Sequence, residues 1–154
     1  MLTSTQIAAL TTELSTDPAA LGYAALTAAP DAAGLVTLLN DTTKGGTLNP
    51  TYVDAHALVN AVVASEYNAL TQAARDLWRD VIVAAGTNGV RVNDAGVKAI
   101  VLAVWAAGTT TRTALAALQT RACSRFEKLF GENAACQDND VKSAIWTDAG
   151  VRRF

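Results

Sequence analysis

The chain of 154 residues has a formal net charge of −2, a hydrophobic content of 51% and only 3 Pro and 10 Gly. This composition excludes a disordered or collagen-like chain, and the length matches one domain of roughly 100–200 residues. Because 32 Ala and 19 Thr stand against 3 Trp, 3 Tyr and 3 Phe, we expect a core of small and branched aliphatic side chains. The apolar run at residues 99–107 is too short for a membrane span of about 20 residues, and residues 1–17 lack the basic start of a signal peptide.

Capping residues and the helical spacing of apolar side chains predict a mostly helical chain. Thr3 and Gln6 have the spacing of a capping box, and Thr71 precedes an apolar stripe with a helical period that includes Trp78. We predict a first helix from residue 3 that carries Ile7, Leu10 and Leu14, then helices over residues 31–40, 51–63, 72–85, 94–107, 112–130 and 140–146, with short turns near residues 18–22 and 65–70.

We interpret these elements as an all-α fold, a single-domain bundle of five or six helices over residues 1–136, followed by an extended C-terminal arm over residues 137–154. Trp78 and Trp105 lie on the apolar stripes of separate predicted helices, so both should be buried. Residues 41–50 form the longest predicted loop, with adjacent glycines and Leu48 as its one large aliphatic side chain. We expect this loop to be mobile in the free protein and ordered only against a neighbouring molecule.

Charges are distributed unevenly along the sequence. Residues 1–74 hold one base and six acids, and residues 75–154 hold eleven bases and eight acids, which gives net charges of −5 and +3. One interpretation is ordinary scatter over a solvated surface; the other is a subunit whose acidic part meets the basic part of a neighbouring copy. Arg121, Arg125 and Lys128 share one helix face, but bases do not cluster with aromatic residues, so we expect no specific nucleic-acid recognition.

The sequence contains none of the common catalytic or metal-binding signatures. We interpret its single histidine, His56, as a surface or packing residue. Cys123 and Cys136 lack the spacing of a zinc site, and both reduced thiols and a disulfide around the Gly131 turn are open interpretations. Lys44 precedes two glycines, but the order of a phosphate-binding loop is missing. We therefore expect no enzyme, no cofactor and no metal.

Three short motifs are distributed over residues 10–131. They are Glu13-Leu14-x-x-Asp17-Pro18-x-x-x-Gly22-Tyr23-Ala24 leading to Leu38-Leu39-Asn40, then Glu66-Tyr67-x-Ala69-Leu70-Thr71 followed by Leu77-Trp78, and last Ser124-Arg125-x-Glu127-x-Leu129-Phe130-Gly131. Together they resemble the opening, the middle and the last long helix of small virion proteins of tailed bacteriophages. No catalytic residue comes with this resemblance.

The resemblance implies a structural protein of the head or neck region, of the head-to-tail connector (adaptor) type. Such adaptors are helical bundles with an extended C-terminal arm, and they form a ring on the portal. The implied partners are copies of the chain itself, the portal protein and tail or neck proteins, with no membrane, and the implied location is the virion. The alternatives are another virion component, for head completion, capsid decoration or tail completion, and a small cytosolic helical module that binds a partner in an Ala-lined groove.

The C-terminal residues carry more apolar side chains than a solvated tail needs. Val141 and Ile145 are four residues apart and share a helix face, with Trp146 next to them. This segment either folds back onto its own bundle or docks on an adjacent subunit or the portal, and we favour docking. The candidate interface residues are then Lys44, Trp146, Arg152, Arg153 and Phe154.

Overall fold

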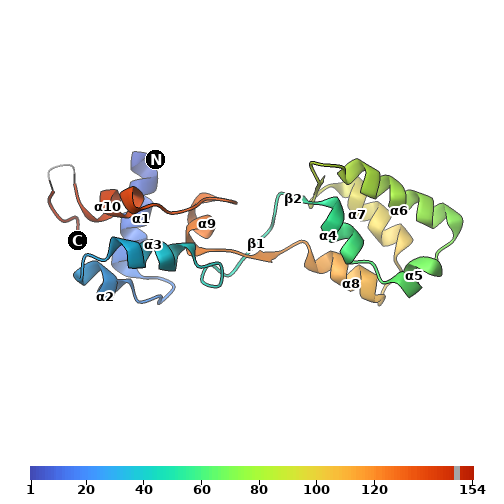
Figure 1. The fold of residues 1–154 in the computed structure, drawn as a ribbon, viewed down its shortest axis with the longest axis horizontal. Coiled ribbons are helices and arrows are strands. Elements are labelled where there is room, and N and C mark those ends of the chain that lie inside the picture. Colours follow the sequence, from blue (N-terminus) through green and yellow to red (C-terminus); the bar gives the residue numbers. More distant parts are fainter. Residues whose placement is uncertain (148–149) are drawn as a thin grey trace. The chain divides into compact units, whose positions relative to one another are not determined.

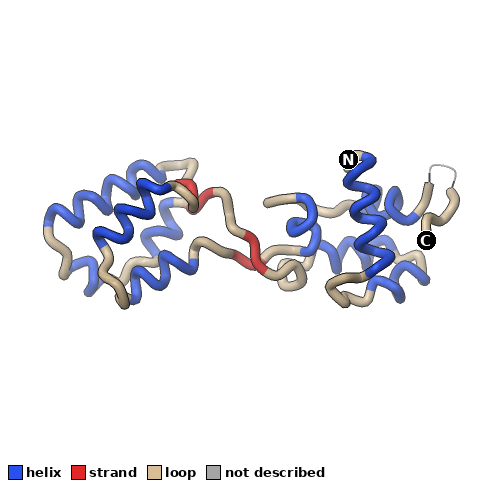
Figure 2. Tube along the Cα trace, turned by 180° about the vertical axis from the view of Figure 1, so that it is seen from behind, coloured by secondary structure: helices blue, strands red, loops and turns tan. Residues whose placement is uncertain are grey.

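The computed structural model describes residues 1–147 and 150–154, and this part of the chain is mostly helical with four two-residue strands (Figures 1 and 2). The chain divides into two compact units. Unit 1 comprises Met1–Leu48 and Ala122–Phe154, and unit 2 comprises Asn49–Arg121. Unit 2 is thus one continuous stretch inserted between the two segments of unit 1. The expected mostly helical character is confirmed. The described residues form ten helices in two compact units, whereas the sequence predicts a single-domain bundle of five or six helices.

Unit 1 is built from both ends of the chain. Its first helix begins at the predicted capping box, in which the Gln6 backbone N–H donates to the Thr3 hydroxyl and the Thr3 N–H donates to Gln6 Oε1 at 2.9 Å.

No helix in residues 1–147 and 150–154 is long and apolar enough to span a bilayer. The helices of unit 1 are α1 (Ser4–Thr16), α2 (Tyr23–Ala28), α3 (Ala32–Asn40), α9 (Arg125–Phe130) and α10 (Asp138–Ile145).

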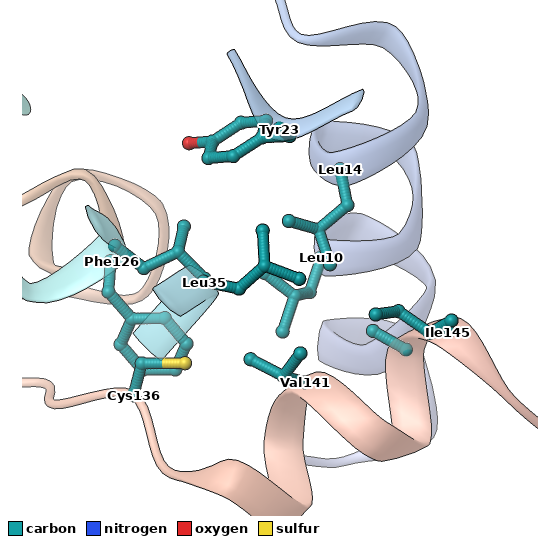
Figure 3. Packing of buried hydrophobic residues seen from close by; sticks show 10 residues of the cluster. Leu10, Leu14, Tyr23, Leu35, Phe126, Cys136, Val141 and Ile145 are labelled. Carbon is teal, nitrogen blue, oxygen red and sulfur yellow. The ribbon is translucent and has the colours of Figure 1, made fainter. Parts of the chain in front are cut away.

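The core of unit 1 joins segments that are far apart in the sequence. Figure 3 shows Leu10 of α1, Leu35 of α3 and Phe126 of α9 packed against Val141 and Ile145 of α10, and all five are buried. α10 was expected to belong to an arm over residues 137–154, separate from a bundle over residues 1–136. It forms part of this core instead, because its apolar face packs against α1.

The chain after α10 folds back on that helix. The Arg153 N–H donates to the Ile145 carbonyl at 2.8 Å, and Trp146 pairs with Arg152 as an antiparallel bridge. Residues 148 and 149 of the expected arm lie outside the described residues. Residues 138–147 of the predicted arm therefore belong to unit 1 of their own chain, and the structure does not show them docked on a neighbour.

Ile145→Ala should lower the free energy of unfolding by roughly 2–5 kcal/mol, because the isoleucine is fully buried and its loss leaves a cavity. Val151→Ala provides the matched control, since Val151 is 61% exposed and should change stability by less than about 0.5 kcal/mol. Urea denaturation followed by circular dichroism measures both. Equal midpoints for the two variants would contradict the position of α10 in the core.

Unit 2 has a core of its own. The structure confirms that Trp78 and Trp105 are buried, and their rings make a T-shaped contact at 5.5 Å between centroids. The helix predicted over residues 72–85 is confirmed, with the Thr71 hydroxyl accepting from the Ala74 N–H. The helices of unit 2 are α4 (Ala55–Asn60), α5 (Ala64–Asn68), α6 (Gln72–Ala85), α7 (Ala95–Val104) and α8 (Thr110–Ala117).

The long helix expected over residues 112–130 is wrong. α8 ends at Ala117, a two-residue strand follows, and α9 begins after Ser124. The Ser124 hydroxyl accepts from the Glu127 N–H at 3.1 Å, and the Ser124 N–H donates to the Glu127 carboxylate at 3.0 Å. This capping box starts a new helix where the chain passes from unit 2 to unit 1.

The four strands form two pairs. β1 (Thr47–Leu48) pairs with β4 (Arg121–Ala122), and β2 (Tyr52–Val53) pairs antiparallel with β3 (Val90–Arg91), with Tyr52 opposite Arg91. The loop before β1, which we expect to be mobile in the free protein, makes backbone hydrogen bonds within its own chain. The Gly45 N–H donates to the Cys123 carbonyl at 2.9 Å, and a Cβ at Gly45 would collide with the Ser124 carbonyl. Glycine is required here because the two backbones approach so closely.

Candidate functional site

The predicted interface residues all lie in unit 1, and the structure brings four of the five together. Arg153 Nε donates to the carbonyls of Ser143 and Trp146, at 3.0 and 3.2 Å. Phe154 lies under the Arg152 guanidinium, 5.8 Å from it. The loop that holds the fifth residue, Lys44, lies at the other end of unit 1 from the C-terminus (Figure 1).

The two arginines of the C-terminal cluster donate to backbone carbonyls, which anchors their side chains but leaves their positive charge unneutralised. Arg152 Nη2 donates to the Thr27 carbonyl at 3.2 Å, so both arginines are bound within the chain. Phe154 is 38% exposed and Trp146 is half-buried. An interface role for these residues remains a prediction.

Residues of the first and third motifs meet in a buried contact in unit 1. Arg125 donates through Nε and Nη2 to the two carboxylate oxygens of Glu13, both at 2.7 Å. The Tyr23 hydroxyl donates to the same carboxylate at 3.1 Å. Because the Glu13 side chain is only 3% exposed, this bidentate pair satisfies a charge that would otherwise be buried alone.

Other residues of the first motif shape the turn between α1 and α2. The Asp17 carboxylate accepts from the backbone N–H groups of Leu21 and Gly22, both at 2.7 Å. Gly22 has a φ of 88°, a left-handed conformation that favours glycine. The motif therefore encodes one turn, which places Tyr23 against Glu13.

Tyr23 should make stability pH-dependent in alkali. Burial raises the pKa of Tyr23, and the Glu13 charge and hydrogen bond raise it further. In the unfolded chain the phenol ionises near pH 10, whereas in the folded chain it stays protonated. The stabilisation is therefore complete below pH 10 and falls as pH rises above 10. Subtracting the free energy of unfolding of Tyr23→Phe from that of the wild type should isolate this loss; a difference that is constant from pH 8 to about pH 11 would contradict it.

In unit 2, Glu66 of the middle motif caps another helix. Its carboxylate accepts from the backbone N–H groups of Thr110 and Thr111, both at 2.8 Å, at the start of α8. These bonds lower the pKa of Glu66, chiefly through Thr111. The buried Thr111 hydroxyl in turn accepts from the Val63 N–H at 2.9 Å, so α5 and α8 are fixed to each other.

The thiols and possible metal ligands make no site in the described part of the chain. Both cysteines are free and buried, so the disulfide interpretation is wrong. Burial, with Asp140 and Asp138 adding to it, raises the pKa of Cys136 to about 12. Residues 1–147 and 150–154 contain no group of three or more His, Cys, Asp or Glu side chains that could hold a metal ion.

The candidate site is an apolar pocket in unit 2, between α7 and α8, with a volume of about 240 Å³. Strands β2 and β3 and helix α4 complete its wall. Aliphatic side chains form most of the lining: Val53, Leu58, Val90, Val92, Val97, Val101, Leu102, Leu115 and Leu118. This lining can make apolar contacts with a bound ligand or with a side chain of a partner.

Three cations line the same pocket. Arg91 Nε donates to the Tyr52 hydroxyl at 3.3 Å, and this bond is the main reason that the pKa of Arg91 is raised, with Asp94 adding to it. Lys98 Nζ donates to the Asn93 side chain at 3.1 Å, and Arg112 Nη1 makes a long contact of 3.5 Å with the Trp105 carbonyl. Neither Lys98 nor Arg112 forms an ion pair among the described residues. The pocket lining includes no acid, so the site combines apolar surface with positive charge.

Sequence reasoning missed this pocket and its cations. Its signal was the breadth of the apolar stripe on α7, where Val97 and Val101 are accompanied by the exposed Leu102. When an apolar stripe is wider than the area that one core can bury, its remaining side chains form a second apolar surface on the helix. The convergence of Arg91 with Lys98 and Arg112 had no local signal, because it depends on how β3, α7 and α8 pack.

Comparison with known proteins identifies no relative: no family model matches the chain, and neither the curated proteins nor the solved structures contain a significant match.

Proposed function

We propose that this chain is a structural component of the virion of a tailed bacteriophage, of the head-to-tail connector type, and that it acts by binding copies of itself and neck proteins rather than by catalysis. The observation that carries the proposal is the bidentate contact between Glu13 and Arg125. These residues belong to the first and third motifs of the resemblance. Their pairing supports the view that the motifs form one fold signature rather than three unrelated matches.

The pocket in unit 2 supports a binding role. A subunit of a ring or chain needs a surface that receives a neighbour, and apolar pockets with a few placed charges are typical of such surfaces. The pocket offers both, because Lys98 and Arg112 line it together with aliphatic side chains. An enzyme is not proposed, because the resemblance brings no catalytic residue.

The charge distribution supports a different contact from the one the sequence suggests. Unit 1 contains nine acids and six bases, a net charge of −3, and unit 2 contains five acids and six bases, a net charge of +1. The acidic and basic halves of the sequence contribute to the same unit, and Glu13 pairs with Arg125 within one chain. We therefore do not propose that the acidic half of one copy meets the basic half of its neighbour. In this proposal, neighbouring copies meet through the cationic pocket.

The experiment is an analysis of particles of the phage or prophage whose genome encodes the chain. We expect mass spectrometry to find the chain in purified particles at a constant ratio to the portal protein. We also expect an antibody against it to label the neck. A chain that occurs only in the soluble fraction of the lysate would overturn the proposal, and label on the capsid or tail tip would favour one of the other virion roles.

A second candidate is a helical protein-binding module that works outside a particle. The same pocket favours it, because a lining of aliphatic and cationic side chains also suits a partner helix. The particle analysis separates the two candidates, since such a module would be recovered with a cellular protein and would be missing from purified particles.

A further inference from the structure

The outward face of α6 combines apolar and acidic side chains. Ala73, Leu77, Asp80 and Ala84 follow one another at helical spacing on this face, and Val83 lies next to it. Leu77 is 44% and Val83 is 72% exposed, which is high for aliphatic side chains of this size. Asp80 is exposed and forms no ion pair among the described residues. We define these five residues as the α6 face.

The neighbouring charges do not neutralise Asp80. Arg79 is the nearest base in the sequence, and it pairs with Asp76 at 3.1 Å. The α6 face thus presents an unpaired carboxylate between two exposed aliphatic side chains. The pocket between α7 and α8 presents the opposite combination: aliphatic lining with the unpaired cations Lys98 and Arg112.

We propose that the α6 face of one copy docks into the α7–α8 pocket of a second copy. Leu77 is the apolar anchor, and Asp80 meets Lys98 and Arg112 of the pocket lining. The inference rests on the proposed function, because it names the contact by which copies of the chain would associate. Opposite charge at this contact sets its orientation, and burial of apolar surface supplies its affinity.

The two surfaces share no residue. Figure 1 shows α7 between α6 and α8 within unit 2, and no α6 residue lines the pocket. Each copy therefore carries one donor surface and one acceptor surface, and the two have no residue in common. A contact of this kind is heterologous, so it builds a ring or an open chain rather than a symmetric dimer.

Mixed cysteine variants test the contact. Leu77→Cys and Leu102→Cys place a thiol on the α6 face and in the pocket wall, and both positions are exposed. The native Cys123 and Cys136 are buried, so the wild type treated with the same short bismaleimide provides the background. We expect a cross-linked dimer when the two variants are mixed, and none with either variant alone.

The matched control replaces Leu102→Cys with Val59→Cys on α4, outside the pocket, where the side chain is 50% exposed against 56% for Leu102. This mixture should give no dimer. A dimer of Leu77→Cys with itself would indicate a symmetric contact and overturn the proposal, as would the absence of a dimer in the mixture with Leu102→Cys.

A charge exchange tests the role of Asp80. Adding Asp80→Lys to the Leu77→Cys variant should lower the cross-linking yield by roughly tenfold, because like charges then meet at the pocket. Adding Lys98→Glu to the Leu102→Cys partner should restore most of the yield. Equal yields in all combinations would overturn the assignment of these charges.

The particle analysis keeps this inference separate from the proposed function. If the chain is found in particles but Asp80→Lys is incorporated as well as the wild type, this contact is wrong and the proposed function stands. If the cysteine mixture cross-links but the chain is missing from particles, the contact stands and the proposed function falls.

Discussion

Trp105→Ala should lower the free energy of unfolding of unit 2 by roughly 3–5 kcal/mol, the range for a buried aromatic side chain. Trp105 is 1% exposed, and its ring meets the Trp78 ring at an interplanar angle of 81°. The substitution removes the apolar area of the indole, the edge-to-face contact and much of the packing between α6 and α7. Trp78→Ala should have a similar effect, because it removes the other ring of the pair.

Leu77→Ala is the matched control for Trp78, because the two residues are neighbours on α6 and Leu77 points outward. It should leave the urea midpoint almost unchanged. Hydrogen exchange locates the effect: Trp105→Ala should raise exchange rates in α6 and α7 more than in α1 and α10. Midpoints close to the wild type for both tryptophan variants would contradict the packing of unit 2.

The features that sequence reasoning predicted correctly are local. The caps at Thr3 and Thr71 bond to backbone groups three residues away, and the burial of Trp78 follows from the period of its own helix. Such features depend on side chains within one or two turns, which a single sequence displays directly.

The features that it missed depend on which distant segments meet. An apolar stripe on α10 shows that one face is buried, but not whether the partner is α1 of the same chain or a neighbouring molecule. The insertion of unit 2 into unit 1 has no local marker either. The loop at residues 41–50 looked unanchored because Cys123, to which Gly45 bonds, lies far along the chain.

The candidate site was hidden for the same reason. Lys98 and Arg112 lie on separate helices, where each looks like an ordinary solvated charge. The sequence predicts Arg125 as one of three bases on a helix face, whereas in the structure it is bound to Glu13. The partner of a charged side chain depends on how distant segments pack, so sequence pattern and composition do not predict it.

Arg125→Ala should lower the free energy of unfolding of unit 1 by about 3 kcal/mol, the lower end of the cost of breaking a buried ion pair. The lower end applies because the Arg125 side chain is 19% exposed to solvent, whereas the Glu13 side chain is only 3% exposed. The substitution leaves the Glu13 carboxylate buried with the Tyr23 hydroxyl as its remaining side-chain donor. Urea denaturation at neutral pH measures the loss.

Two further variants separate the contact from a general loss of charge. Arg79→Ala removes an exposed arginine that pairs with Asp76, and it should change stability by less than about 1 kcal/mol. Arg125→Lys keeps the charge but loses the planar fork that binds both oxygens of Glu13, so it should fall between the wild type and Arg125→Ala. If Arg125→Ala were as mild as Arg79→Ala, the first and third motifs would not be joined by this pair, and the support that the contact gives to the proposed function would be lost with it.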